Sequence, residues 1–146
     1  MPTYSFVEVN ATLVASGAVL DLGAGSANSE EGITVVAAGD KNTMTVGADG
    51  EVMHSLHADK SGQVTLRYLK TSPTNAKLMA IYDAQGESAA LWGSNVIAIT
   101  LPSTGEVISC RSCAFKKVPD INYQKDGGTV EWVFDAGKID RIMGTF

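Results

Sequence analysis

The sequence predicts a mainly β domain: an antiparallel sandwich or barrel with one flanking α-helix and a long hairpin arm. Short segments that alternate apolar and polar residues recur along the chain, which is the period of half-buried strands. Fifteen glycines in 146 residues indicate many turns. Helical periodicity occurs in one segment only, so the helix is expected to flank the sheet rather than dominate the fold.

The strand predictions rest on two clear cases. In segment 62–70, Val64, Leu66 and Tyr68 alternate with polar neighbours. Segment 129–135 repeats the pattern: its large apolar residues point one way, and Thr129, Glu131 and Asp135 point the other. Further strands are expected at 3–9, 32–37, 42–46, 94–101 and 105–116, with a hairpin turn at 102–105.

One helix is expected at about 73–85. Ser72 can cap its start, Pro73 suits a first position where no N–H is needed, and Gly86 can end it. An apolar stripe near helical period comprises Leu78, Met79, Ile81 and Tyr82.

Two segments are expected to be loops or projections. Segment 23–32 is rich in glycine and serine and ends in the adjacent carboxylates Glu30 and Glu31, which we interpret as a solvated loop. Segment 38–61 turns at 48–50 and is interpreted as a polar hairpin arm, with the candidate contact residues Asp40, Lys41, Asp49, Glu51, His54, His57, Asp59 and Lys60. A lone hairpin is only marginally stable in water, so we expect a neighbouring subunit to receive this arm and the free arm to be mobile.

Length and charge narrow the function classes. The length fits one domain over 1–146, and 16 acidic against 11 basic residues give a net charge of −5, which disfavours electrostatic binding of phosphates. Charged residues make up 18%, below the usual share of about 25%, so part of the surface is expected to be buried against other copies.

The first ten residues resemble no signal peptide, and the apolar runs are too short to span a bilayer. These two features predict a chain that is made and kept in the cytoplasm without membrane insertion.

The sequence offers little catalytic chemistry. His54 and His57 with Cys110 and Cys113 supply the ligand count of tetrahedral zinc, but residues i and i+3 of a strand face opposite sides, so the cysteines are expected to diverge and to be buried as small hydrophobes. A triad of Ser55, a histidine and Asp59 lies too close in sequence to converge. We therefore predict no catalytic residue, no metal, no cofactor and no enzyme activity.

Several segments resemble one family of structural proteins. These are 31–62, 66–78, 90–93, 114–117 and 123–140, in order along nearly the whole chain. They are similar to the tail tube proteins of long contractile-tailed bacteriophages. The resemblance implies a tail-tube-like sandwich or barrel with one helix, hexameric rings stacked into a hollow tube, and an arm that reaches the next ring. It also implies sheath, baseplate and tail-terminator partners, transient passage of DNA, and a place in the virion tail after assembly in the host cytoplasm.

An acidic tube bore would repel DNA phosphates and let the genome slide. Strand alternation makes Glu131 and Asp135 the candidate bore-facing residues. Other readings stay open: a tube subunit of a tailocin or secretion-type contractile injection system, a monomeric adhesin or capsid-decoration protein, or a small metal-binding or hydrolytic β-domain that uses the histidines and cysteines.

Overall fold

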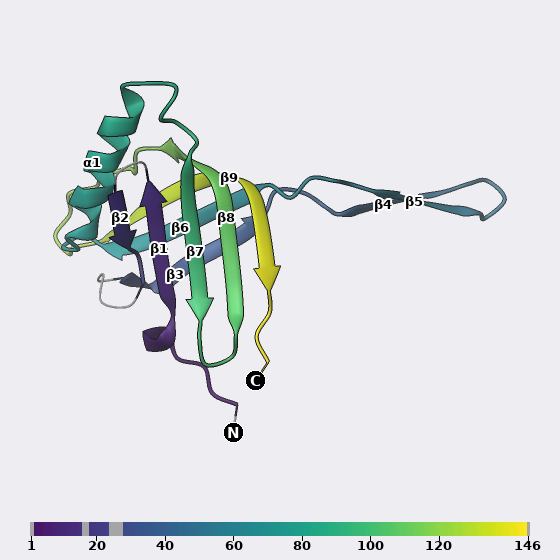
Figure 1. Cartoon of the computed structure of the whole chain (residues 1–146), viewed down its shortest axis with the longest axis horizontal. Coiled ribbons are helices and arrows are strands. Elements are labelled where there is room, and N and C mark those ends of the chain that lie inside the picture. Colours follow the sequence, from purple (N-terminus) through teal and green to yellow (C-terminus); the bar gives the residue numbers. More distant parts are fainter. Residues whose placement is uncertain (1, 16–17, 24–27, 146) are drawn as a thin grey trace.

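The computed structural model describes residues 2–15, 18–23 and 28–145, and it confirms a mainly antiparallel β fold with one α-helix (Figure 1). One sheet has seven strands in the order β2-β1-β7-β8-β9-β6-β3, and β4 and β5 form a separate two-stranded sheet. The elements are η1 (Phe6–Glu8), β1 (Asn10–Ala15), β2 (Ala18–Asp21), β3 (Asn28–Ala37), β4 (Asn42–Val46), β5 (Val52–Leu56), β6 (Gly62–Leu69), α1 (Thr74–Gly86), β7 (Asn95–Leu101), β8 (Glu106–Lys117) and β9 (Thr129–Ile142).

The large sheet bends into two layers because β9 changes partners along its length. Its first half pairs with β6 over Thr129–Ala136, while pairing with β8 continues to Ile142. At the bend, Ser112 adopts a positive φ of 54° opposite Gly137, where an added Cβ would lie 3.0 Å from the Cβ of Ser112. The layer of β1, β7 and β8 therefore crosses the layer of β3 and β6 (Figure 1).

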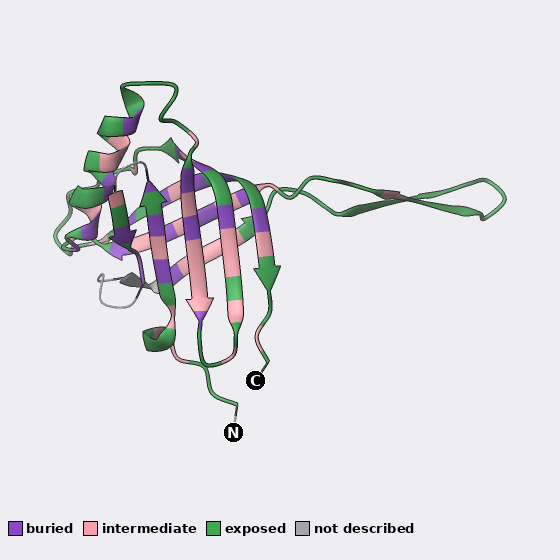
Figure 2. Cartoon of the chain, viewed as in Figure 1, coloured by how far each residue is buried: buried purple, intermediate pink, exposed green. Residues whose placement is uncertain are grey.

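The hydrophobic core lies between these layers. Trp132, Tyr68 and Phe134 are its largest fully buried side chains. The Phe115 ring lies 4.4 Å from that of Phe134 and 5.9 Å from that of Trp132, centroid to centroid. Buried positions alternate with partly exposed ones along β6 and mostly with exposed ones along the start of β9, as the sequence predicted (Figure 2).

The helix follows the expected bounds within one residue. The expected cap was wrong in detail: the N-cap is Pro73, which makes no side-chain cap hydrogen bond, and the helix begins at Thr74. The Ser72 hydroxyl, one residue earlier, accepts a hydrogen bond from the Thr74 N–H over 3.2 Å, and Gly86 is the last helical residue. Leu78 is fully buried, and Ile81 and Tyr82 pack against the core. Met79, in contrast, is exposed.

Three local expectations were wrong. Segment 3–9 is not a strand: a 3-10 turn forms at Phe6–Glu8, where the Ser5 hydroxyl accepts the Val7 N–H, and the first strand begins at Asn10. The strand expected at 129–135 runs on to Ile142, because pairing with β8 continues past the bend. Of the expected loop 23–32, residues 24–27 lie outside the described residues, and the backbone from Asn28 onward belongs to β3, including Glu30 and Glu31. That extension exists because β6 supplies hydrogen-bond partners that no local pattern shows.

Candidate functional site

The predicted arm is a long two-stranded hairpin that projects from the body, and it confirms this part of the expected fold (Figure 1). β4 and β5 pair in register from Asn42↔Leu56 to Val46↔Val52. The tip is a tight turn in which the Gly50 N–H donates to the Gly47 carbonyl over 3.0 Å. Gly50 has a φ of +88°, a conformation that side chains rarely adopt, so the glycine is needed there.

The arm has one apolar face, which corrects the expectation of a polar hairpin. Directly paired residues share a face and alternate along the strands. The apolar face consists of Met44, Val46, Val52 and Leu56, with Asn42 and His54 beside them. The four apolar side chains are exposed by between 48% and 81%. The opposite face carries mostly hydroxyl side chains: Thr43, Thr45 and Ser55, together with Met53.

Most of the eight predicted contact residues lie at the tip or the root of the arm, and several form hydrogen bonds with residues close to them in the chain. At the tip, an Asp49 side-chain oxygen accepts the Glu51 N–H over 3.1 Å. Near the root, Asp59 accepts the Ser61 N–H over 2.8 Å, and the hydrogen bonds from Ser61 lower the pKa of the Asp59 carboxyl. The carboxylates of Asp49 and Asp59 therefore stabilise turns within their own chain.

The two histidines form side-chain hydrogen bonds within the arm. His54 Nδ1 lies 3.1 Å from Asn42 Nδ2, and His57 Nε2 lies 2.6 Å from Thr43 Oγ1. The backbone carbonyl of Lys41 accepts the His57 N–H over 2.9 Å. Asp40 is exposed at the root of the arm, just before Lys41.

The root of the arm is joined to β9. The Lys60 carbonyl accepts the Ile139 N–H over 2.9 Å, and Lys60 Nζ lies 3.8 Å from Asp140 Oδ1. Arg111 also donates to Asp140, and this hydrogen bond lowers the pKa of the Asp140 carboxyl. The Lys60 ammonium group thus has an ion-pair partner within its own chain. These contacts fix where the arm leaves the body.

The candidate bore residues lie together on the outward face of β6 and β9, as alternation predicted. Glu131 pairs with Arg67 at 3.5 Å, and Arg67 also donates to Thr34 Oγ1 over 2.8 Å. Asp135 accepts a hydrogen bond from Gln63 over 3.3 Å. The negative charge of Glu131 is therefore largely balanced by Arg67, and Asp135 is the more effective acidic group on this face.

The histidines and cysteines do not meet. Cys110 and Cys113 are both fully buried in the core, whereas His54 and His57 lie on the exposed arm. The expected divergence of the cysteines was wrong: the bulge at Ser112 turns both side chains inward. Burial raises the pKa of Cys110 to about 11 and that of Cys113 to about 12. Among the described residues, no three His, Cys, Asp or Glu side chains group as metal ligands, and no helix is long and apolar enough to cross a membrane.

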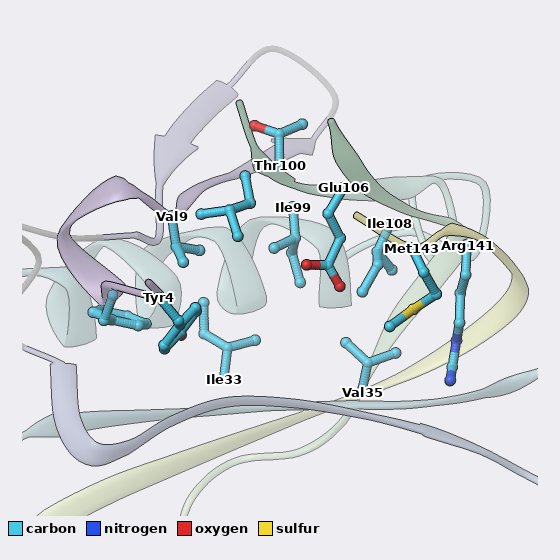
Figure 3. Close-up of a pocket in the computed structure, with 12 residues that line it drawn as sticks. Tyr4, Val9, Ile33, Val35, Ile99, Thr100, Glu106, Ile108, Arg141 and Met143 are labelled. Carbon is cyan, nitrogen blue, oxygen red and sulfur yellow. The ribbon is translucent and has the colours of Figure 1, made fainter. Parts of the chain in front are cut away.

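A cavity of about 310 Å³ opens between the two layers (Figure 3). Ile33 and Val35 of β3 face Ile99 and Ile108 across it, and Glu106 and Arg141 line it as well. We call this the interlayer cavity. Its walls are mostly apolar, so it offers apolar contact rather than a reaction site.

A second, larger groove lies beside α1. Its volume is about 460 Å³, and it is lined by Lys70, Asn75, Ala76, Met79, Val118, Pro119, Ile121, Val130 and Trp132. We call this the distal groove. The sequence analysis missed it because its residues come from separate segments. The one available signal was segment 118–123, where apolar residues stand among the polar Asp120 and Asn122; its Ile121 is 61% exposed.

Comparison with known proteins gives one family match and several structural neighbours. The family model described as "Bacteriophage PhiTE tail tube protein" matches residues 1–144. No curated protein matches the sequence significantly.

The structural neighbours share the fold at low sequence identity. A chain of the sheath-tube complex of an extracellular contractile injection system, PVC, in the extended state, aligns with a TM-score of 0.63 and 10% identity, covering 98% of this chain and 93% of that one. A chain of the anti-feeding prophage tube terminating cap aligns at 0.58 with 6% identity and 99% and 93% coverage. A chain of the six-fold symmetrised anti-feeding prophage baseplate aligns at 0.58 with 10% identity and 97% and 96% coverage.

Proposed function

Since the chain belongs to the bacteriophage PhiTE tail tube protein family, we propose that its copies form hexameric rings that stack into a hollow tube conducting DNA during ejection. The family is structural, which confirms the expectation that the chain is a tail component and not an enzyme. Six-fold rings are supported by the fold shared with a baseplate chain whose structure is described as six-fold symmetrised.

The uncovered apolar face of the arm is the observation that carries this proposal. Four large apolar side chains on the hairpin are exposed. Figure 2 shows that the hairpin projects from the body and is exposed along nearly all its length. Burying such a side chain gains about 1.5–3 kcal/mol, and a hairpin has no core of its own to provide that burial. A second copy of the chain supplies the missing surface. The tip and root charges, with Asp40, Lys41 and Glu51 foremost, then fix the register between subunits.

The polar outward face of β6 and β9 is proposed to line the bore. That face carries the hydroxyl and amide groups of Thr65 and Gln63, the Glu131–Arg67 pair and Asp135, with Val133 as its apolar member. Such a surface offers DNA phosphates no cluster of cations to bind, and Asp135 repels them. The genome would therefore pass without adhering.

The partners follow from the same assembly. A stacked tube would be surrounded by a sheath, start on a baseplate and end at a terminator, and the structural neighbours include chains of a sheath-tube complex, a baseplate and a tube cap. The assembled protein would reside in the virion tail, after assembly in the host cytoplasm.

A second candidate function is a tube subunit in a tailocin or other contractile injection system without a genome. It is favoured by the fold shared with chains of the PVC and anti-feeding prophage systems. Neighbouring genes decide between the two: capsid and terminase genes indicate a phage, and their absence beside sheath and baseplate genes indicates an injection system.

Negative-stain electron microscopy of the purified chain, with size-exclusion chromatography, tests the tube proposal. Rings or hollow tubes are expected at high protein concentration. A species that stays monomeric at every concentration, and also when baseplate is added as a nucleus, would contradict it.

A further inference from the structure

We propose that the apolar face of the arm docks in the distal groove of a neighbouring copy of this chain. The inference rests on the proposed self-assembly and adds to it the surface that receives the arm. It joins the exposed apolar face of the arm to a groove whose rim includes the exposed side chains of Met79, Val118 and Ile121.

The groove matches the arm in chemistry. Val130 and Trp132 of β9, Met79 of α1, and Val118 and Ile121 of the segment after β8 make its surface apolar. The Trp132 Nε1–H is already used by Asn75 Oδ1 at 3.1 Å, so the indole leaves no unpaired donor in the groove. An incoming aliphatic side chain therefore meets apolar surface without stranding a polar group.

The positions of arm and groove favour contact between copies. The arm leaves the body where β3 ends and β6 begins, at Ala37 and Gly62. The groove lies at the other end of β6, beside Lys70 and Val130. The arm and α1 stand at opposite ends of the long axis (Figure 1). A copy displaced along β6 thus brings its groove to the arm, and this head-to-tail contact repeats from copy to copy.

The charges at the two sites are complementary. The arm carries Asp49 and Glu51 and no lysine or arginine between residues 42 and 56. The groove has Lys70 on its rim, with Nζ 4.4 Å from the ring centroid of Tyr123. The segment beside it, 116–125, holds three lysines and one aspartate. Opposite charges at the rim would steer the arm and set its register.

The interlayer cavity is the competing receptor. It is smaller than the distal groove, at about 310 against 460 Å³. Its wall includes Tyr4, Phe6 and Met143 of the chain's own terminal segments, and its two charged residues, Glu106 and Arg141, are of opposite sign and give no net attraction for an acidic arm tip. These features favour the distal groove.

Paired charge insertions test the two surfaces. Met44→Glu on the apolar face of the arm and Met79→Glu in the groove each place a charge where docking would bury it, so each should raise the protein concentration needed for assembly by about tenfold or more. The controls are Thr45→Glu on the opposite face of the same strand and Ala84→Glu on the same helix, which lines no part of the groove. For both controls, the protein concentration needed for assembly should stay within about twofold of that of the native chain.

Cysteine pairs then locate the contact. Met44→Cys combined with Ile121→Cys should give a ladder of covalent multimers on a non-reducing gel, because a disulfide requires Cα atoms within about 7 Å. Thr45→Cys with Ile121→Cys, which points the thiol away, should give far less. The native thiols are buried with raised pKa values and do not compete.

Three results would overturn the inference, and they distinguish a wrong receptor from a wrong function. If Met44→Cys crosslinks to Thr100→Cys in the interlayer cavity and not to Ile121→Cys, the receptor is wrong while the tube function stands. The same holds if Met79→Glu assembles like the native chain. If the native chain never self-associates, even with baseplate added, the proposed function fails and this inference fails with it.

Discussion

The backbone N–H of Ile139 donates to the carbonyl of Lys60 over 2.9 Å, and this bond joins the last strand to the root of the arm. The arm is therefore not a loosely attached loop. Gly62, two residues further on, lies against the same strand: an added Cβ would stand 2.6 Å from Ile139 Cδ1 and 2.2 Å from the Val36 carbonyl oxygen.

We expect Gly62→Ala to destabilise the fold by about 1–3 kcal/mol, because the Cβ forces apart β3 and β6. Urea unfolding followed by circular dichroism measures the change. Gly39→Ala is the matched control, since nothing lies within 4 Å of an added Cβ there. Equal stability of the two variants would show that the strands separate at no cost.

The buried thiols should be unreactive in the folded chain. With pKa values of about 11 for Cys110 and about 12 for Cys113, little thiolate exists at pH 8. A chromogenic disulfide reagent should react with neither thiol until urea unfolds the chain. Rapid reaction under native conditions would mean that the core opens around the bulge at Ser112.

Raised thiol pKa values also predict how stability depends on pH. Above the ordinary thiol pKa of 9.0 the unfolded chain loses its thiol protons, while the folded chain keeps them up to pH 11 to 12. The stabilisation from the two buried thiols is therefore complete below pH 9 and falls as the pH rises from 9 through 11 to 12. Unfolding by urea at pH 8 and at pH 10 should show lower stability at pH 10. The Cys110→Ala and Cys113→Ala double variant should show a smaller drop, which separates the thiols from Tyr68, whose pKa burial also raises.

Asp140 should titrate at higher pH once its partner is removed. The hydrogen bond from Arg111 is the largest cause of its lowered pKa, so Arg111→Gln should bring the pKa back toward the ordinary value of 3.8. In the native chain this contribution to stability is present above pH 3.8 and is lost as pH falls through the lower folded pKa. A carboxyl NMR titration measures the shift, and Lys117→Gln is a control because Lys117 pairs with Asp120 instead.

The arm should be protected only after assembly. Its strands are exposed and pair only with each other, so the amides of β4 and β5 should exchange rapidly in the free subunit and slowly in tubes. Hydrogen exchange with mass spectrometry compares the two states, and β6 serves as the internal reference because it is buried in both. Equal exchange of the arm in both states would show that no neighbour covers it.

Charge reversal on the outward face of β9 should slow DNA passage. Glu131→Lys with Asp135→Lys turns that face positive, so phosphates would bind to it while tubes still form. The rate of genome release from assembled particles is the measurement. Asp83→Lys with Glu87→Lys, on and just after α1, makes the same charge change away from the sheet face. Normal release from the β9 variant would remove both residues from the bore.

Local patterns were enough for much of the fold. Alternation placed Val64, Leu66 and Tyr68 on the core side of β6 and Glu131 and Asp135 on the outward side of β9, because side chains in a strand must alternate. The Ser-Pro start and Gly86 placed the ends of the helix within one residue because helix start and stop signals are local, although the N-cap is Pro73 rather than Ser72. The arm was visible as a polar hairpin over 38–61 with a turn at 48–50, and the structure pairs β4 with β5 within it.

The sequence by itself determined the fold class, the helix and the hairpin, since each depends on neighbours within a few residues. Only the tertiary structure decided that β3 begins at Asn28, that both Cys110 and Cys113 face the core, and that the distal groove exists. Strand extension, the bulge and the groove depend on which distant segments pair and pack, and that pairing is set by the free energy of the whole core rather than by any local period.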